Sequence, residues 1–224
     1  MILLPLASIF SYFYAMKIKI CGLFREQDIE FANEAKPDFI GFVFAEKSKR
    51  FVNAKQAEDL RKNLSKEITA IGVFANAKTD FICELHQNKT IEIAQLHGSE
   101  SDDYIRELKS KCSIPIIRAA MASETADCRE AFQCALAAGD YFLLDSHTPG
   151  SGKAFNWEHL RNIDLSKNIF LAGGINLENI KEAMMLNPYA IDISSGAETD
   201  GIKDREKILK LVEAARCFCK QKKN

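Results

Sequence analysis

The chain has 224 residues, of which 47% are hydrophobic and 27% are charged, and its formal net charge is −1. This length can bury a full core and still form a single domain, as α/β barrels do. The near-zero charge removes the electrostatic basis for sequence-independent nucleic-acid binding, so we expect no nucleic-acid partner.

The chain begins with an apolar, uncharged segment, residues 1–16, that ends at Met16. It is too short to span a bilayer comfortably, and it lacks the basic start and clear cleavage site of a secretory signal. We therefore expect residues 1–16 to be an upstream start or a disordered extension, and we expect no membrane partner. The domain itself is predicted over residues 17–219, with a basic tail at 220–224.

Eight apolar runs of strand length follow, and their hydrophobicity is continuous, as strands buried on both faces require. Helical patterns lie between the runs, and no linker or shift in composition divides the chain. The runs cover residues 17–21, 38–44, 70–74, 91–96, 114–118, 140–144, 168–172 and 190–194. This alternation predicts one α/β domain, a (β/α)₈ barrel or TIM barrel. A doubly wound open sheet is the competing topology, but it usually has five or six strands.

In such a barrel, the carboxyl ends of all strands face one mouth, where chemistry is placed. Nearly every apolar run ends in a polar residue or a glycine. The residues at or just beyond these ends include Cys21, Arg50, Gln95, His97, Arg118 and Asp145. A thiol and a carboxylate that can exchange protons suggest acid–base catalysis on a small molecule.

Each of these residues also has a structural interpretation. Cys21 can be a small buried hydrophobe, and Asp145 can be a turn residue that bonds its own loop. Arg50 can belong to a solvated loop, Arg118 can be the partner of a neighbouring carboxylate, and His97 can be a satisfied loop histidine.

Two glycine-containing turns follow the last two runs. Gly173 and Gly174 come after the seventh run, and Ser194, Ser195 and Gly196 end the eighth. The turns after strands 7 and 8 form the usual phosphate site of these barrels, because glycines let backbone N–H groups approach the anion. We therefore predict phosphate binding at these five residues, and a phosphorylated small-molecule substrate.

The cysteine and histidine patterns are uninformative about metals. The seven cysteines are scattered, the close pair Cys217 and Cys219 has the wrong spacing for a Cys-x-x-Cys site, and the four histidines show no ligand spacing. We expect no metal site, and reduced thiols in the cytoplasm fit the odd cysteine count.

Seven ordered motifs carry a resemblance to a known family. They are Lys19-Ile20-Cys21-Gly22-Leu23, Gly41-Phe42-Val43-Phe44 leading to Ser48-Lys49-Arg50-Phe51-Val52, Gly72-Val73-Phe74, Gln95-Leu96-His97-Gly98, Leu143-Leu144-Asp145-Ser146, Leu171-Ala172-Gly173-Gly174 and Asp192-Ile193-Ser194-Ser195-Gly196-Ala197-Glu198. Over residues 17–216, the chain resembles the phosphoribosylanthranilate isomerases of tryptophan biosynthesis.

The resemblance implies an Amadori rearrangement without cofactor or metal. N-(5-Phosphoribosyl)anthranilate would become 1-(2-carboxyphenylamino)-1-deoxyribulose 5-phosphate. By position, Asp145 is expected to be the general acid and Cys21 the general base, and Arg50 is expected to receive the anthranilate carboxylate. The further substrate-binding residues expected at the mouth are Gln95, His97, Arg118 and Asp192.

Some alternatives stay open at this stage. Another phosphosugar isomerase or epimerase barrel is the enzymatic rival, and a non-catalytic phosphate-binding barrel is the rival of a different class. Either Lys19 or Arg118 can be the cation that favours the Cys21 thiolate, and the protein can be a monomer or a homodimer.

Overall fold

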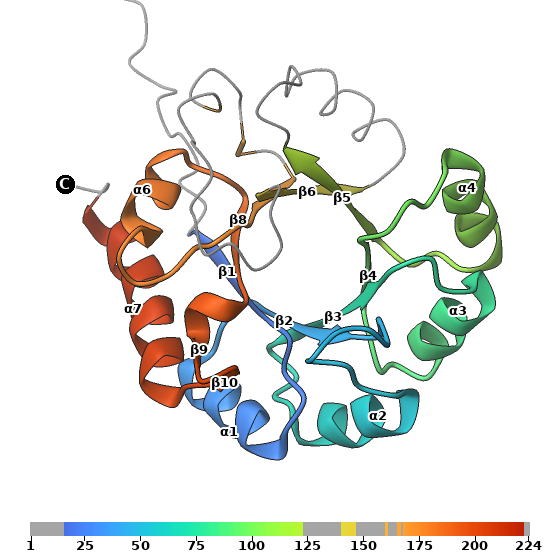
Figure 1. The fold of residues 1–224 in the computed structure, drawn as a ribbon, viewed down its shortest axis with the longest axis horizontal. Coiled ribbons are helices and arrows are strands. Elements are labelled where there is room, and N and C mark those ends of the chain that lie inside the picture. The colour runs from blue at the N-terminus through green and yellow to red at the C-terminus, as the bar shows by residue number, and fades with distance from the viewer. Residues whose placement is uncertain (1–15, 123–139, 147–159, 161–164, 167, 222–224) are drawn as a thin grey trace, which may run out of the picture.

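Eight parallel strands close into a barrel, and helices surround it (Figure 1). Each strand pairs with the next one along the chain, and β8 pairs with β1 to complete the ring. The strands are β1 (Lys17–Cys21), β2 (Phe39–Val43), β3 (Thr69–Phe74), β4 (Ile93–Leu96), β5 (Ile116–Ala122), β6 (Tyr141–Ser146), β7 (Ile169–Leu171) and β8 (Ala190–Ile193). The predicted (β/α)₈ barrel is confirmed, and the open sheet is excluded.

The structure is a computed structural model, and it describes residues 16–122, 140–146, 160, 165–166 and 168–221. Residues 1–15 of the predicted extension and residues 222–224 of the predicted tail lie outside the described residues. The final helix continues through Lys220 to Gln221, so the chain is still helical where the tail was expected to begin.

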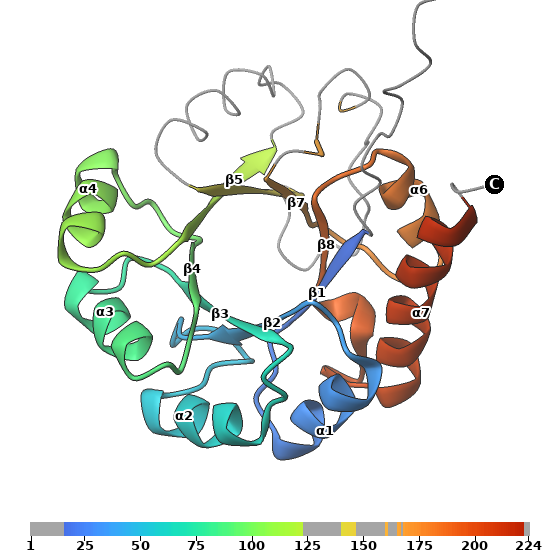
Figure 2. The same ribbon diagram turned by 180° about the vertical axis from the view of Figure 1, so that it is seen from behind.

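The described helices form a layer around the strands. They are α1 (Glu26–Ala35), α2 (Ala54–Asn63), α3 (Thr79–Gln87), α4 (Asp102–Lys111), α6 (Ile180–Met185) and α7 (Arg205–Gln221). The helix α7 packs between α6 and α1, so the last described helix lies against the first (Figures 1 and 2). Side chains cap α2 and α4, since Asn53 accepts from the Gln56 N–H and Ser101 from the Tyr104 N–H.

The segment between β8 and α7 holds three short elements. The 3₁₀ helix η2 (Ser195–Ala197) is followed by a two-stranded hairpin of β9 (Glu198–Thr199) and β10 (Ile202–Lys203). Asp200 and Gly201, both with positive φ, make its two-residue turn.

Two apolar layers stabilise the barrel. The outer layer lies between the sheet and the helices and includes Ile18 and Ile20 of β1. The inner layer lies inside the barrel and includes residues such as Ile117, Leu143 and Phe170. A packed interior of this kind is a core and not a pore.

The inward-facing positions of three strands change from apolar to polar toward their carboxyl ends. Successive inward positions are two residues apart on a strand. The change runs from Ile93 to Gln95 on β4, from Leu143 to Asp145 on β6, and from Ala190 to Asp192 on β8. The sheet therefore delivers polar side chains to one end of the barrel interior.

The fifth and sixth strands are longer than the sequence predicted. The strand β5 ends at Ala122 and not at Arg118, and β6 ends at Ser146 and not at Leu144. Small residues after Arg118 gave no signal for where the strand ends. As a result, Arg118 lies within β5 and Asp145 lies within β6.

Candidate active site

Cys21 lies at the end of β1, where the adjacent strand leaves room for its sulfur. The thiol side chain is buried. A Cβ at Gly41 of β2 would lie 2.7 Å from the Cys21 Sγ, so only glycine fits there without displacing the thiol. The next residue, Gly22, has φ +83°, and a Cβ on it would lie 2.3 Å from the Arg50 Cδ. These glycines let the thiol and the Arg50 side chain approach the strand end closely.

Lys19 lies two residues before Cys21 and is fully buried. Its ammonium donates to the Asp192 Oδ2 at 2.7 Å and to the Gln95 Oε1 at 2.8 Å, and it also interacts with the Cys21 thiol. Burial by itself would lower the pKa of Lys19, but Asp192 and Cys21 raise it above its usual value. Lys19 is therefore a fixed cation inside the barrel.

The Cys21 thiol is subject to opposing effects. Burial raises the pKa of Cys21 above its ordinary value, while the charges of Lys19 and Lys203 and a hydrogen bond from Lys19 act to lower it. Of the two cations left open by the sequence, Lys19 is the one that acts on the thiol.

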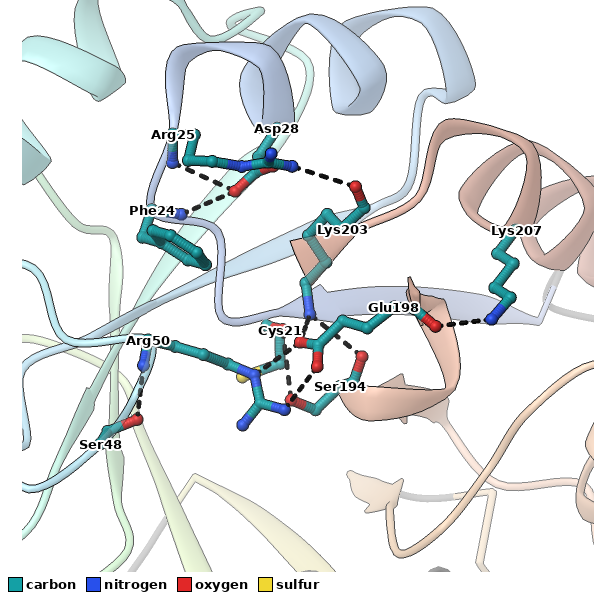
Figure 3. Close-up of polar contacts among 10 residues, drawn as sticks. All are labelled: Cys21, Phe24, Arg25, Asp28, Ser48, Arg50, Ser194, Glu198, Lys203 and Lys207. Carbon is teal, nitrogen blue, oxygen red and sulfur yellow. Dashed lines mark hydrogen bonds and ion pairs between the residues drawn. The ribbon is translucent and has the colours of Figure 1, made fainter. Parts of the chain in front are cut away.

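Arg50 is clamped from one side by Glu198 (Figure 3). Its Nε and Nη2 donate to the Glu198 Oε1 and Oε2 at 2.6 and 2.7 Å, which is a bidentate pair. Lys203, the cross-strand partner of Glu198 in the β9–β10 hairpin, also donates to Oε1 and reaches the Ser194 carbonyl at 3.0 Å. The two pairs hold the guanidinium over the end of β1.

The charges in this clamp alter one another. Burial alone would raise the pKa of Glu198, but Arg50 and Lys203 lower it overall. Burial lowers the pKa of Lys203, and Glu198 opposes that effect. One carboxylate between two cations leaves an excess positive charge beside Cys21, which suits an anionic ligand.

Asp145 lies on the opposite side of the mouth, in contact with His97. The His97 Nε2 is 3.5 Å from the Asp145 Oδ2, and the two side chains are 35% and 30% exposed. The Gln95 Nε2 is 3.0 Å from the His97 Nδ1. Because Gln95 also accepts from Lys19, a continuous series of polar contacts joins the Cys21 side to the Asp145 side.

The turns after β7 and β8 meet at the mouth. Gly173 and Gly174 have φ +97° and +65°, in the region that favours glycine. A Cβ at Gly196 would lie 1.9 Å from the Ile175 carbonyl oxygen, so the two turns touch through backbone. Ser194 lies between them and Cys21, with its Oγ 3.4 Å from the Cys21 carbonyl oxygen.

Asp192 has one oxygen without a partner. Its Oδ2 accepts from Lys19, but its buried Oδ1 has no hydrogen-bond partner within the described part of the chain. A buried, unsatisfied carboxylate oxygen is costly, and a hydroxyl or N–H from a ligand would satisfy it.

Arg118 does not join this cluster. It lies on the outward-facing side of β5, between the inward-facing Ile117 and Ala119, and its guanidinium pairs with Asp102 at the start of α4. Arg118 is therefore the partner of a neighbouring carboxylate, which is the structural alternative that the sequence left open. The expectation that it lies at the mouth assumed that the strand ended there, whereas β5 continues to Ala122.

The sequence assigned no role to Glu198 or Lys203. Glu198 ends the last of the seven motifs, which by itself gives it no role, and none of the motifs includes Lys203. The dipeptide Asp200-Gly201 is a strong hairpin signal, and it was the pattern that could have brought these two side chains together.

Neither a metal centre nor a membrane span is found in the part of the chain that the structure describes. No three His, Cys, Asp or Glu side chains gather there into a cluster that could hold a metal ion. None of the described helices combines the length and apolar character needed to cross a bilayer. Residues 147–159, which follow β6, lie outside the described residues.

The fold and this mouth define a (β/α)₈-barrel enzyme with a thiol, a carboxylate and a cation-rich cluster at the carboxyl ends of its strands. A family model described as N-(5'-phosphoribosyl)anthranilate (PRA) isomerase matches residues 18–214. The chain belongs to this family.

Known relatives agree over almost the whole chain. The N-(5'-phosphoribosyl)anthranilate isomerase of Endomicrobium trichonymphae is 42% identical over 205 residues, which cover 89% of this chain and 98% of the relative. The crystal structure of phosphoribosyl anthranilate isomerase from Thermotoga maritima has a TM-score of 0.81 and 31% identity, covering 90% and 99% of the two chains. A phosphoribosyl anthranilate isomerase in complex with reduced 1-(o-carboxyphenylamino)-1-deoxyribulose 5-phosphate has a TM-score of 0.78 and 29% identity, with coverages of 90% and 99%.

Proposed function

We propose that Asp145 and Cys21 are the general acid and the general base of an Amadori rearrangement. The chain is an isomerase of tryptophan biosynthesis, and it converts N-(5-phosphoribosyl)anthranilate into 1-(2-carboxyphenylamino)-1-deoxyribulose 5-phosphate. The observation that carries the residue assignment is the contact series Cys21–Lys19–Gln95–His97–Asp145, which spans one mouth.

Asp145 opens the sugar ring in the first step. It gives its proton to the ribose ring oxygen, and the C1–O bond breaks as the anthranilate nitrogen forms an iminium with C1. The group must be accessible to the substrate and held by a rigid element. A 30% exposed side chain on an inward position of β6 meets both requirements.

Cys21 then takes the proton from the ribose C2 carbon. The C2–H electrons move into the iminium and give an enolamine, which tautomerises to the ketone. The thiolate is the reactive form, and Lys19 and Lys203 stabilise it in a buried site. The raised pKa of Cys21 also makes its thiolate a stronger base than an ordinary one.

Arg50 binds the anthranilate carboxylate with the part of its guanidinium that Glu198 leaves free. A guanidinium has five N–H donors, and Glu198 engages only Nε and Nη2. The Nη1 group can therefore donate to a second carboxylate while Glu198 keeps the guanidinium plane fixed. The extra positive charge of the Arg50–Glu198–Lys203 cluster favours that carboxylate.

The remaining substrate contacts follow from the same geometry. The unsatisfied Asp192 Oδ1 accepts from a sugar hydroxyl, and Gln95 and His97 contact the sugar beside Asp145. The phosphate binds at the two touching turns, through Gly173, Gly174, Ser194, Ser195 and Gly196.

The proposal includes neither cofactor nor metal, because the rearrangement moves protons within one molecule and changes no overall oxidation state. We expect a monomer or a homodimer, since all proposed site residues come from one chain. The described cysteines Cys21, Cys83, Cys112 and Cys217 are free thiols, which supports the cytoplasm as the expected compartment.

A fluorescence assay tests the function directly. Purified protein is mixed with freshly generated phosphoribosylanthranilate, and the loss of its fluorescence is followed with time. We expect turnover on this substrate and none on ribulose 5-phosphate, which lacks the carboxylate for Arg50. A folded protein that leaves phosphoribosylanthranilate unchanged, or that turns over only the simple sugar phosphate, would contradict the proposal.

A further inference from the structure

Four polar side chains contact one another in sequence across the barrel mouth. Each contact limits which atoms of the next side chain can donate or accept a hydrogen bond. The Lys19 Nζ is 2.8 Å from the Gln95 Oε1, the Gln95 Nε2 is 3.0 Å from the His97 Nδ1, and the His97 Nε2 is 3.5 Å from the Asp145 Oδ2. Lys19 and Gln95 are buried, so water does not substitute for these partners.

The first link fixes the orientation of the Gln95 amide. A lysine ammonium has three donors and no acceptor, so the group facing Lys19 has to be the amide oxygen. The amide nitrogen of Gln95 then faces His97. This orientation follows from the chemistry of Lys19 and does not depend on how the amide was assigned.

The second link fixes the histidine tautomer. The Gln95 NH₂ group can only donate, so the His97 Nδ1 has to accept and carries no proton. A neutral imidazole has one N–H, which then lies on Nε2. The Nε2 atom is the one that lies 3.5 Å from the Asp145 Oδ2.

We propose that Gln95, held in orientation by Lys19, is a positioning residue that fixes His97 in its Nε2–H tautomer and so presents a donor to Asp145. The inference rests on the acid role proposed for Asp145. Before the reaction, the His97 donor occupies Oδ2 and leaves the transferable proton on Oδ1. After the proton has gone to the ring oxygen, the same donor stabilises the carboxylate.

The 3.5 Å separation between the His97 Nε2 and the Asp145 Oδ2 is long for a hydrogen bond. The tautomer does not depend on this last link, because the contact with Gln95 alone determines it. The inference can therefore be tested in the protein without substrate.

The test exchanges the donor at position 95 for an acceptor of the same shape. In Gln95→Glu, the carboxylate can only accept, so it accepts a hydrogen bond from an Nδ1–H, and Nε2 then carries no proton toward Asp145. In Gln95→Met, which adds no charge near Cys21, the ring is free to populate both tautomers. Gln87→Glu, on the exposed end of α3, is the matched control.

Two readouts are combined. Nitrogen-15 NMR of the imidazole rings, with the His97 signals assigned by their loss in His97→Asn, reports which nitrogen carries the proton. We expect Nε2–H in the wild type and in Gln87→Glu, Nδ1–H in Gln95→Glu, and a mixture in Gln95→Met. Steady-state kinetics should show kcat lowered at least ~10-fold in both position-95 variants, with the larger effect on kcat than on KM.

A wild-type His97 that carries its proton on Nδ1, or a Gln95→Glu protein that keeps the wild-type tautomer, would overturn the inference. These outcomes are separate from the proposed function. An active enzyme with Nδ1–H contradicts the positioning role alone, whereas an inactive protein with the expected Nε2–H tautomer contradicts the isomerase assignment alone.

Discussion

The two sides of the barrel mouth place the proposed general base and the proposed general acid in different electrostatic surroundings. On the β1 side, Cys21 is buried, and the cations Lys19 and Lys203 both act on it. On the β6 side, Asp145 is 30% exposed and lies beside His97, whose proposed Nε2–H tautomer donates without carrying a charge.

This difference fits the roles that we propose for Cys21 and Asp145. A base is active when it is deprotonated, so fixed cations favour its reactive form. A general acid has to carry its proton when the substrate binds, and an adjacent fixed cation would favour the ionised carboxylate instead. Arg118 fits this rule, because its charge is directed to Asp102 on the outer face of the sheet and not to the mouth.

The largest effect is expected on the exposed side. Asp145→Asn is nearly isosteric but has no transferable proton, so kcat should fall about 10²–10⁴-fold while the fold is retained. Steady-state kinetics and circular dichroism check this. Asp103→Asn, on the exposed face of α4, serves as the control. Near-wild-type turnover in a folded Asp145→Asn protein would contradict the proposal that Asp145 is the general acid.

The buried side should respond strongly to loss of the thiol. Cys21→Ser keeps the shape, but a hydroxyl is much harder to deprotonate than a thiol, so we expect kcat to fall at least ~10²-fold. Cys217→Ser, at an exposed free cysteine, should leave kcat unchanged. Full activity in Cys21→Ser would mean that Cys21 is core packing and that another group takes the C2 proton.

The pH dependence distinguishes the two sides further. Burial raises the pKa of Cys21, and the charged groups facing it are Lys19, Asp192, Lys203 and Arg50. The deprotonated form is active, so kcat/KM should keep rising with pH beyond the range in which an ordinary thiol ionises. Alkylation of Cys21, in a Cys217→Ser background, should follow the same curve and be slowed by product. A rate of inactivation that is independent of pH would contradict this.

A smaller effect is expected at the cation cluster. Arg50→Ala should weaken binding of the carboxylate-bearing product by about 1.5–3 kcal/mol, the range for hydrogen bonds to charged groups. Isothermal titration of the product measures it, with Arg106→Ala on α4 as the control. Glu198→Gln, compared with Glu178→Gln, should weaken binding by less, since Arg50 remains. Unchanged product affinity in Arg50→Ala would show that Arg50 does not contact the substrate.

No effect is expected from removing the start of the chain. A protein that begins at Met16 keeps the buried Met16 side chain and the whole of β1. Its melting temperature and kcat should equal those of the full chain, as differential scanning calorimetry and the fluorescence assay can establish. Aggregation or loss of activity would show that residues 1–15 stabilise the barrel.

The strands could be predicted because parallel strands buried on both faces have to be apolar throughout. The same argument located Cys21 at a strand end and Gln95 and His97 beside one. The direction of Arg118 could not be predicted, since it depends on whether β5 ends at that residue, and the small residues that follow carry no signal.

The ion pair between Arg50 and Glu198 could not be predicted from the sequence either. Glu198 is far from Arg50 in the chain, and a short hairpin after β8 places it, together with its partner Lys203, beside the guanidinium. The order of contacts from Lys19 to Asp145 likewise depends on distances between β1, β4 and β6 that no periodicity encodes.

Gly41 determines the position of the Cys21 sulfur because it has no side chain. The space it leaves on β2 is where the Cys21 sulfur sits, so the volume at one strand sets the position of the reactive atom on the next. A methyl group there would displace the sulfur and leave every charged residue of the mouth unchanged. Anyone who grafts a different base onto position 21 has to treat residues 21 and 41 as one unit of design.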